Sequence, residues 1–289
     1  MADATSADNE IDIERHIEQV LAVHRPVGPA LSAAAAFMKR WFKPTFTGLE
    51  RLPSGPALFV GNHALLAIDG AIFANLMNYD YGRFLRGIGD RTLFANERYA
   101  KFAIAQGAAV GQRPVVEALM AAGQDLLIFP GGAHEAVKRP EQRYDLLWRE
   151  RFGFVRIAAF MGFTIMPFAA VGPDEYFEHH IEGDELLDLQ LVRWLMSAGV
   201  VPDDFRRDLL PPIPSGVFGS PMPKPKTTFF GFGRPIDLSA FAGKELTDRQ
   251  QHRIRDRVAG EIEEQVFAML KLREQRRHHD GLLRRILSL

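Results

Sequence analysis

Short apolar runs alternate with segments of helical periodicity between residues 45 and 172, and no other feature constrains the fold as strongly. Each run has the composition of a buried strand and is bounded by glycine, proline or the start of a helical segment. The runs are 46–58, which a Pro-Ser-Gly-Pro turn divides into two strands, then 84–89, 125–129 and 164–171. Such alternation predicts an α/β fold with a mostly parallel central sheet flanked by helices.

Helical patterns bracket this region on both sides. Residues 11–23 and 29–42 predict an N-terminal helical pair, and a capping box at 247–250 opens a long C-terminal helix. We therefore divide the chain into two parts. Residues 1–44 form an N-terminal helical membrane-association segment, and residues 45–289 form the α/β domain.

Periodicity weakens and prolines gather between residues 174 and 226. This predicts an excursion over the sheet, with a short helix near 186–196 and a returning strand at 227–232. The basic tail, 281–289, alternates leucines with two arginines, so it is either a lipid-binding segment or a solvated helix end.

The end of the second predicted helix carries an aromatic pair, Trp41 and Phe42, among the cations Lys39, Arg40 and Lys43. Aromatic rings with cationic neighbours suit a membrane–water interface. A helical hairpin packed on its own domain accounts for the same pattern. The sequence does not decide between these two interpretations.

Composition excludes several classes of protein. The 289 residues are 47% hydrophobic, and the net charge of −1 gives no global field that would favour nucleic acid. The absence of cysteine excludes disulfides and thiolate chemistry. The first residues lack the features of a secretory signal, and no apolar run reaches the ~20 residues that span a bilayer. We expect a cytoplasmic protein that associates with membranes peripherally.

A histidine follows the apolar run 57–60 and precedes a buried helical segment at 70–77. In open α/β sheets ligands bind beyond the carboxyl ends of the strands, which is where His63 is expected. His63 can take a proton from a hydroxyl, and Asp69 can orient the ring and stabilise the imidazolium. Taken alone, His63 is also explained as a strand-end residue bonded to a backbone carbonyl.

Two further segments offer binding groups at the same sheet edge. The turn at 130–132 contains Gly131 and Gly132, which let a ligand approach backbone N–H groups, and Glu135 follows directly. Arg113 opens a predicted helix and has the fork geometry for a phosphate or carboxylate. An ordinary turn and a surface ion pair are the simpler alternatives for these two features.

Other enzyme classes lack their motifs in this chain. No serine lies in Gly-x-Ser-x-Gly, and neither a phosphate-binding lysine loop nor Gly-x-Gly-x-x-Gly is present. The histidine pairs at 179–180 and 278–279 lack the i, i+4 spacing of a zinc site, so no metal is expected.

Taken in order, these segments resemble the glycerolipid acyltransferase family, which includes bacterial 1-acylglycerol-3-phosphate acyltransferases. That family shows a catalytic His and Asp, a Gly-rich segment with an Arg, Phe-Pro-Glu-Gly, and an apolar strand with a proline. The matching segments here are Asn62-His63 with Asp69, then 107–113, 129–132 and 165–168, with 48–56 as the lead-in. The ordered set is far more specific than any one piece.

Two departures from the family pattern bear on the site. Five residues separate His63 from Asp69 where the family has four, which would rotate a helical carboxylate by ~100°. Gly131 stands where the family has glutamate. The run 129–135 resembles instead the branch that acylates neutral alcohols, the diacylglycerol acyltransferases and plant phytyl ester synthases, as do 144–148 and 154–158.

The resemblance implies an O-acyltransferase that uses acyl-CoA or acyl carrier protein as co-substrate, without a further cofactor or metal. The acceptor is expected to be a neutral lipid alcohol at a membrane surface, because Gly131 removes an acid from an otherwise apolar setting. Lysophosphatidic acid acylation in phospholipid synthesis and a non-catalytic lipid-binding protein of the same fold remain the alternatives. The implied roles are catalysis for His63 and Asp69, and substrate binding for Arg113, Gly131, Gly132 and Glu135.

Overall fold

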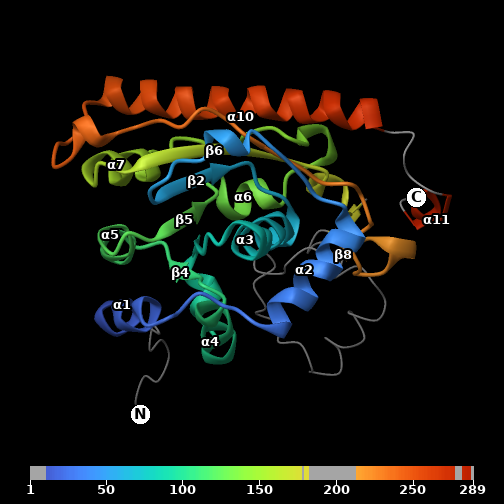
Figure 1. The fold of residues 1–289 in the computed structure, drawn as a ribbon. Coiled ribbons are helices and arrows are strands. Elements are labelled where there is room, and N and C mark those ends of the chain that lie inside the picture. Colours follow the sequence, from blue (N-terminus) through green and yellow to red (C-terminus); the bar gives the residue numbers. More distant parts are fainter. Residues whose placement is uncertain (1–10, 178, 182–212, 277–281, 288–289) are drawn as a thin grey trace, which may run out of the picture.

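The computed structural model describes residues 11–177, 179–181, 213–276 and 282–287, and it is built around a seven-stranded sheet (Figure 1). The strand order is β1-β9-β6-β2-β5-β3-β4, and every pair is parallel except β6 with β9. The mostly parallel sheet predicted from the sequence is therefore confirmed. The strands are β1 (Thr45–Thr47), β2 (Ala57–Gly61), β3 (Leu85–Gly89), β4 (Ala109–Val110), β5 (Asp125–Ile128), β6 (Thr164–Val171) and β9 (Phe229–Phe232).

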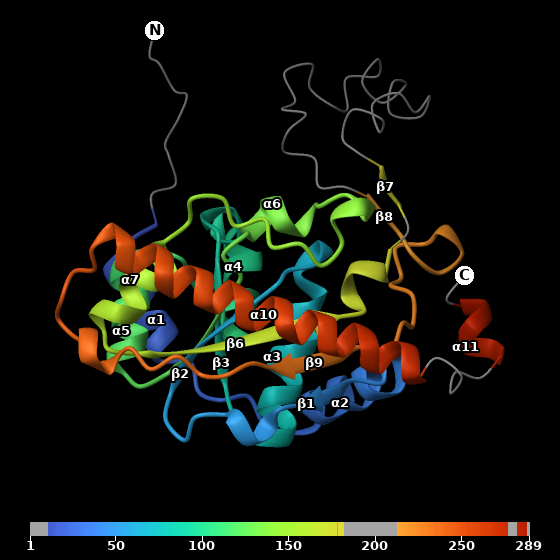
Figure 2. The same ribbon diagram turned by 90° about the horizontal axis from the view of Figure 1, so that it is seen from above.

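Helices cover both faces of the sheet. The long α10 crosses one face together with α5 and α7, and α3 and α2 pack on the other (Figures 1 and 2). The predicted N-terminal helical pair and long C-terminal helix are both present. The helices are α1 (Ile13–Leu21), α2 (Pro29–Phe42), α3 (Ile68–Tyr81), α4 (Glu97–Ala105), α5 (Arg113–Ala121), α6 (Gly132–Ala136), α7 (Gly153–Phe160), α10 (Asp248–Arg276) and α11 (Leu282–Leu287).

The central strand β2 is apolar at every position because both of its faces are buried. Leu58 and Val60 point into the core beneath α5, α7 and α10, while Ala57 and Phe59 point into the core beneath α3. A parallel strand with helices on both faces has no solvated side, so alternation is lost and a continuous apolar run results.

The N-terminal helix α1 is tied to the sheet by buried polar groups. The Val110 N–H donates to His16 Nε2 at 3.1 Å. The Arg86 guanidinium, on β3, is buried and donates to the carbonyl groups of Val20 and Val23. Burial lowers the pKa of Arg86 to about 10, so the guanidinium remains charged at neutral pH.

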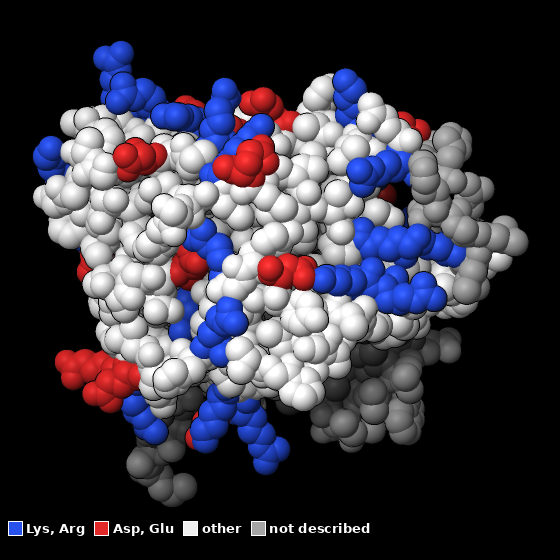
Figure 3. Space-filling view, in the orientation of Figure 1, with Lys and Arg blue, Asp and Glu red and all other residues white. Residues whose placement is uncertain are grey.

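Helix α2 packs on α3, and its terminal rings lie against the body of the protein. Phe42 is only 3% exposed, and Trp41 Nε1 donates to the Pro223 carbonyl at 2.9 Å. Of the two interpretations left open by the sequence, packing on the protein's own domain accounts for Phe42, while Trp41 is only partly buried and its indole N–H is bound internally. Lys and Arg side chains do gather over this end of α2 (Figure 3), where the sequence has Lys39, Arg40 and Lys43.

Membrane association of residues 1–44 as a segment stays a prediction. In the described part of the chain no helix is both long and apolar enough to cross a bilayer. The C-terminal α11 lies against the end of α2, where Arg284 donates to the Trp41 carbonyl at 2.8 Å.

Some elements differ from the sequence prediction. Residues 109–110, expected within a turn, form the short edge strand β4, and the proline-rich excursion contains a two-stranded ribbon of β7 (His179–Ile181) and β8 (Ile213–Ser215). Two residues carry too little periodicity to indicate a strand, so β4 is specified by its pairing with β3. The helix expected near 186–196 and the histidine pair at 278–279 lie outside the described residues.

The packing around β2 yields a stability prediction for Gly61. A Cβ atom there would lie 2.5 Å from the ring of Phe168, which is itself stacked on Phe73 at 4.0 Å and cannot move aside. We expect Gly61→Ala to lower the free energy of unfolding by about 1–3 kcal/mol, the usual cost of overpacking. Urea denaturation measures this change.

Gly87 provides the matched control, because it also lies in a strand but a Cβ there meets nothing within 4 Å. Gly87→Ala should change stability by no more than about 0.5 kcal/mol. Equal effects of the two substitutions would contradict the packing described here.

Candidate active site

The end of β2 is held by an amide clamp. The buried Asn62 side chain donates to the Ala170 carbonyl at 2.9 Å and accepts from the Ala170 N–H at 2.7 Å. This pair of bonds fastens the chain to β6 one residue before His63. The backbone at His63 is therefore fixed by the sheet rather than by a mobile loop.

The Asp69 side chain reaches the His63 ring, which is the contact required if Asp69 orients the ring as the sequence analysis expects. Asp69 Oδ2 lies 3.1 Å from His63 Nδ1 and also accepts from the Ala64 N–H at 3.0 Å. Asp69 is buried in the first turn of α3. One carboxylate oxygen thus orients both the ring and the backbone that follows it.

The extra residue between His63 and Asp69 is accommodated by unusual backbone geometry. Leu66 and Ala67 both have left-handed conformations, with φ of 60° and 54°. Each costs a non-glycine residue roughly 1–2 kcal/mol. The chain thereby turns before α3 begins, so the rotation of ~100° expected for a helical insertion does not separate Asp69 from His63.

An aromatic ring covers the other side of the imidazole. Phe129, directly after β5, stacks on His63 with a centroid distance of 4.1 Å and an interplanar angle of 11°. A Cβ at Gly70 would lie 2.9 Å from the Phe129 ring, so glycine at this position of α3 makes room for the stack. The stack and the Asp69 bond together leave the His63 ring a single orientation.

Glu135, on α6 directly after the glycine turn, contacts the backbone of His63. Its Oε1 accepts from the His63 N–H at 2.8 Å, and its Oε2 is buried without a hydrogen-bond partner. A Cβ at Gly131 would lie 1.9 Å from Oε2, so only glycine at 131 admits this carboxylate. Gly131 thus leaves position 131 without an acid but makes room for the Glu135 carboxyl, which the sequence analysis also named as a binding group.

The glycine turn carries a cation that sequence reasoning missed. Arg151 donates to the Pro130 carbonyl at 2.9 Å, and a Cβ at Gly132 would lie 2.8 Å from its guanidinium. The Gly132 N–H donates to the Phe129 carbonyl at 2.9 Å, so this group is already engaged. The nearest signal for Arg151 was the charged run 149–151, which has no periodicity to mark it as a site.

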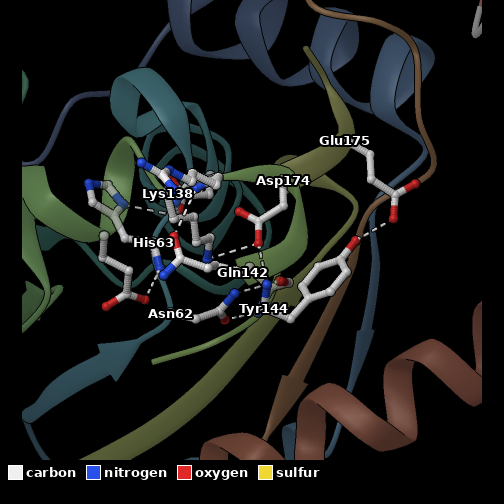
Figure 4. Close-up of polar contacts among 12 residues, drawn as sticks. Asn62, His63, Lys138, Gln142, Tyr144, Asp174 and Glu175 are labelled. Atoms are coloured by element: carbon white, nitrogen blue, oxygen red, sulfur yellow. Dashed lines mark hydrogen bonds and ion pairs between the residues drawn. The ribbon is translucent and has the colours of Figure 1, made fainter. Parts of the chain in front are cut away.

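A row of buried charges continues from Glu135. Lys138 lies 2.8 Å from Asp174, and both side chains are almost fully buried (Figure 4). Asp174 also accepts from the Tyr144 N–H at 2.7 Å, and the Tyr144 hydroxyl donates to Glu175 at 2.6 Å. Lys138 therefore offsets the acids Asp174 and Glu135, which lowers the cost of burying these charges together.

These neighbours set the protonation of the site. Burial alone would lower the pKa of His63, but the Asp69 carboxylate and then Glu135 raise it above the ordinary value. Burial raises the pKa of Glu135 to about 7, although Lys138 and the His63 N–H act against the shift. The pKa values of His63 and Glu135 are thus both raised, and perturbed pKa values of this kind are typical of catalytic groups.

Arg113 is not brought together with His63. It pairs with Glu117 at 2.7 Å, lies 5.2 Å from the Phe160 ring centroid and lines a cavity of ≈ 470 Å³. Leu58 and Ile128 line the same cavity, so it opens on the face of the sheet opposite to His63 and Phe129. The sequence placed Arg113 at a sheet edge because it opens a predicted helix, which does not specify the face of the sheet.

A small cleft adjoins the buried charges. It measures ≈ 30 Å³ and is lined by Leu65, Lys138, Arg143, Asp174 and Phe177 among others. That is room for little more than a water molecule. The His63 side chain is itself only 10% exposed.

Comparison with known proteins places this site in context. Residues 43–171 match the family model described as Acyltransferase. The chain is 30% identical over 255 residues to phytyl ester synthase 2, chloroplastic, of Arabidopsis thaliana, covering 83% of this chain and 36% of that protein. It is 26% identical over 207 residues to the DGAT1/2-independent enzyme synthesizing storage lipids of Mus musculus, covering 72% and 57%.

A solved structure, the 1-acyl-sn-glycerophosphate (LPA) acyltransferase PlsC from Thermotoga maritima, aligns over 87% of both chains with a TM-score of 0.46 and 13% identity. That likeness is too weak to carry an argument about the site. The chain spans about a third of the length of the two plant relatives, 36% and 34%.

The burial of Glu135 yields a pH prediction. Its pKa is about 7 in the folded protein against 4.5 for the free side chain, so the folded state binds the extra proton. The resulting stability is complete below about pH 4.5 and is lost as the pH rises through about 7. Glu135→Gln removes this titration. As the pH rises from about 4.5 to about 7, the free energy of unfolding of Glu135→Gln should therefore increase relative to that of the wild type, by up to about 3 kcal/mol.

Urea denaturation of both proteins at a series of pH values measures the difference. Curves that run parallel from acid to alkaline pH would mean that Glu135 does not hold a proton in the folded state.

Proposed function

We propose that this chain is an acyltransferase that transfers a fatty acyl group from a thioester to a lipid alcohol, because residues 43–171 match the Acyltransferase family model and the chain is similar to a phytyl ester synthase. The observation that carries this proposal is the buried pair of His63 and Asp69 at the carboxyl end of a central strand. A histidine held in this way is a ready general base for a hydroxyl group.

The hydrogen bond to Asp69 assigns the two ring nitrogens. His63 Nδ1 donates to Asp69, which leaves Nε2 as the base. Nε2 accepts the hydroxyl proton while the alcohol oxygen bonds to the thioester carbonyl carbon. The tetrahedral intermediate then collapses, the carbon–sulfur bond breaks, and the imidazolium returns its proton to the departing thiolate. The products are an ester and a free thiol, and Asp69 stabilises the imidazolium between the two steps.

The donor's phosphate groups would bind at the glycine turn. Arg151 lies against this turn, and Arg149 lies beside α6 through a 3.4 Å contact with His134. Two guanidinium groups on one side of the site suit phosphate oxygens better than Arg113, which lies on the opposite face. Acyl-CoA and acyl carrier protein both present a phosphate next to the pantetheine arm, so both remain possible donors.

The charges around His63 favour a neutral acceptor. Lys138 is committed to Asp174 at 2.8 Å, so it offers no net positive charge to a phosphate. The buried Glu135 carboxyl would repel an anionic headgroup whenever it ionises. Phe129 stacks on the His63 ring, and Phe177 lines the small cleft beside Lys138 and Asp174, so apolar surface accompanies these charges. The relative named phytyl ester synthase 2 supports the same choice, an alcohol without a phosphate.

Substitutions of the pair test the mechanism. His63→Ala should lower turnover by roughly 10²–10⁴-fold, the usual contribution of a general base. Asp69→Asn should lose up to roughly 10⁴-fold, because the amide favours the wrong tautomer of His63. Release of free thiol from an acyl-CoA in the presence of a lipid alcohol measures both rates.

His252→Ala is the control, since His252 is exposed on α10 and should leave turnover unchanged. Near-full activity of His63→Ala in a folded protein would exclude the mechanism. Thiol release that is absent from the wild type with every lipid alcohol would instead favour a lipid-binding protein.

The acceptor is tested by competition between alcohols. With one acyl-CoA, diacylglycerol or a long-chain alcohol should give a higher kcat/KM than lysophosphatidic acid, because Lys138, the cation that acts on His63, is paired with Asp174. Arg151→Ala should raise KM for the donor and leave KM for the acceptor nearly unchanged. Faster turnover of lysophosphatidic acid, with an acceptor-specific defect in Arg151→Ala, would reverse the assignment to the phosphorylated acceptor.

A further inference from the structure

Exposed apolar side chains follow three neighbouring strands at the edge where His63 lies. Leu66 comes after β2, Val137 after β5 and Leu93 after β3, and all three are exposed. Because β2, β5 and β3 are adjacent and parallel, the segments after them share the carboxyl edge of the sheet. Together with Tyr99 and Phe102 of α4 we call these five residues the apolar rim.

Helix α4 contributes the largest part of the rim. Tyr99 is 71% exposed and Phe102 is 67% exposed, and their spacing of three places both rings on one side of the helix. The other side of α4 packs on the core through Ala103 and Ile104. The Asn96 side chain caps the helix by accepting from backbone N–H groups, so the rings are presented by a well-formed element.

Leu66 is placed by the same backbone strain that joins His63 to Asp69. Its left-handed conformation, with φ of 60°, is unfavourable for a branched apolar residue, yet its side chain is directed outward and exposed. Strain of this kind persists where the surrounding structure fixes it, and it gathers at functional sites. An exposed apolar side chain is therefore held in the short segment that joins the base to its partner.

Cations accompany the apolar residues along this edge. Arg98 and Lys101 are exposed on α4, although Lys101 pairs with Glu97 at 2.8 Å, and Arg139 and Arg149 are exposed beyond α6. Figures 1 and 2 show α4 and α6 along the same edge of the sheet. Aromatic rings interspersed with arginine and lysine suit the boundary between the apolar and headgroup layers of a bilayer that contains anionic lipid.

We propose that the apolar rim docks the carboxyl edge of the sheet on a lipid bilayer and so holds His63 over the membrane. Tyr99 and Phe102 enter the interface, Leu66 and Leu93 extend the contact toward the site, and the cations bind anionic headgroups. The proposal rests on the proposed function in one respect only: transfer to a lipid alcohol is the reason why His63 should face the bilayer. The exposure and position of the apolar rim, and the charges of the neighbouring residues, do not depend on that function.

Vesicle binding without any substrate tests the rim. The full chain is sedimented with phosphatidylcholine vesicles, with and without phosphatidylglycerol, as wild type and as Tyr99→Ser/Phe102→Ser. The double variant should bind roughly tenfold more weakly or worse, because two aromatic rings no longer leave water. Phosphatidylglycerol should strengthen wild-type binding, and salt should weaken that gain.

Phe267→Ser is the matched control, since Phe267 is 72% exposed but lies on α10, which covers a face of the sheet away from the carboxyl edge. It should bind vesicles as the wild type does. Equal binding by wild type and double variant, equal loss in Phe267→Ser, or no binding by the wild type would each overturn the proposal.

Turnover distinguishes a failure of the rim from a failure of the proposed function. With an acceptor short enough to dissolve, the double variant should retain wild-type kcat, and with the acceptor in vesicles its rate should fall with its binding. Vesicle binding through the rim without thiol release from any acyl-CoA would leave the rim in place and reject the acyltransferase. An equal loss of rate with dissolved and vesicle-bound acceptor would reject the rim as a docking surface.

Discussion

The arrangement of the site depends on a single carboxylate oxygen. Asp69 Oδ2 contacts the His63 ring and accepts the Ala64 N–H, so it fixes both the base and the chain that leaves it. The chain can make these two contacts only by holding Leu66 and Ala67 in left-handed conformations. Two hydrogen bonds to a charged group, each worth about 1.5–3 kcal/mol, are of the right size to offset that strain.

A second constraint couples Gly131 to Glu135. The Glu135 carboxyl occupies the space that any side chain at 131 would need, and it accepts the His63 N–H while Asp69 contacts the ring. Two buried acids thus act on His63, and both raise its pKa against the effect of burial. Lys138 and Asp174 extend the row and limit the cost of burying these charges.

The elements that hold this row come from distant parts of the chain. Asn62 joins β2 to β6, and Tyr144 joins the segment after α6 to the turn after β6. Arg273 of α10 binds Glu175, so the long helix on one face of the sheet is linked to the end of the charged row. Helix α1 is joined to β3 in the same way, through the buried Arg86 guanidinium. Fold and site are therefore stabilised by the same polar contacts.

Much of this architecture follows from the sequence alone. The apolar runs and helical segments determined the α/β class, the helical ends and a mostly parallel sheet, because period and turn chemistry are local properties. They also determined that His63 stands at a strand end with Asp69 close behind it. Tertiary structure decided whether Asp69 could reach His63, which face Arg113 occupies and which residue supplies the second acid. Those outcomes depend on backbone strain at Leu66, on the face of the sheet on which α5 packs and on the space beside Gly131, and none of these is a property of a local pattern.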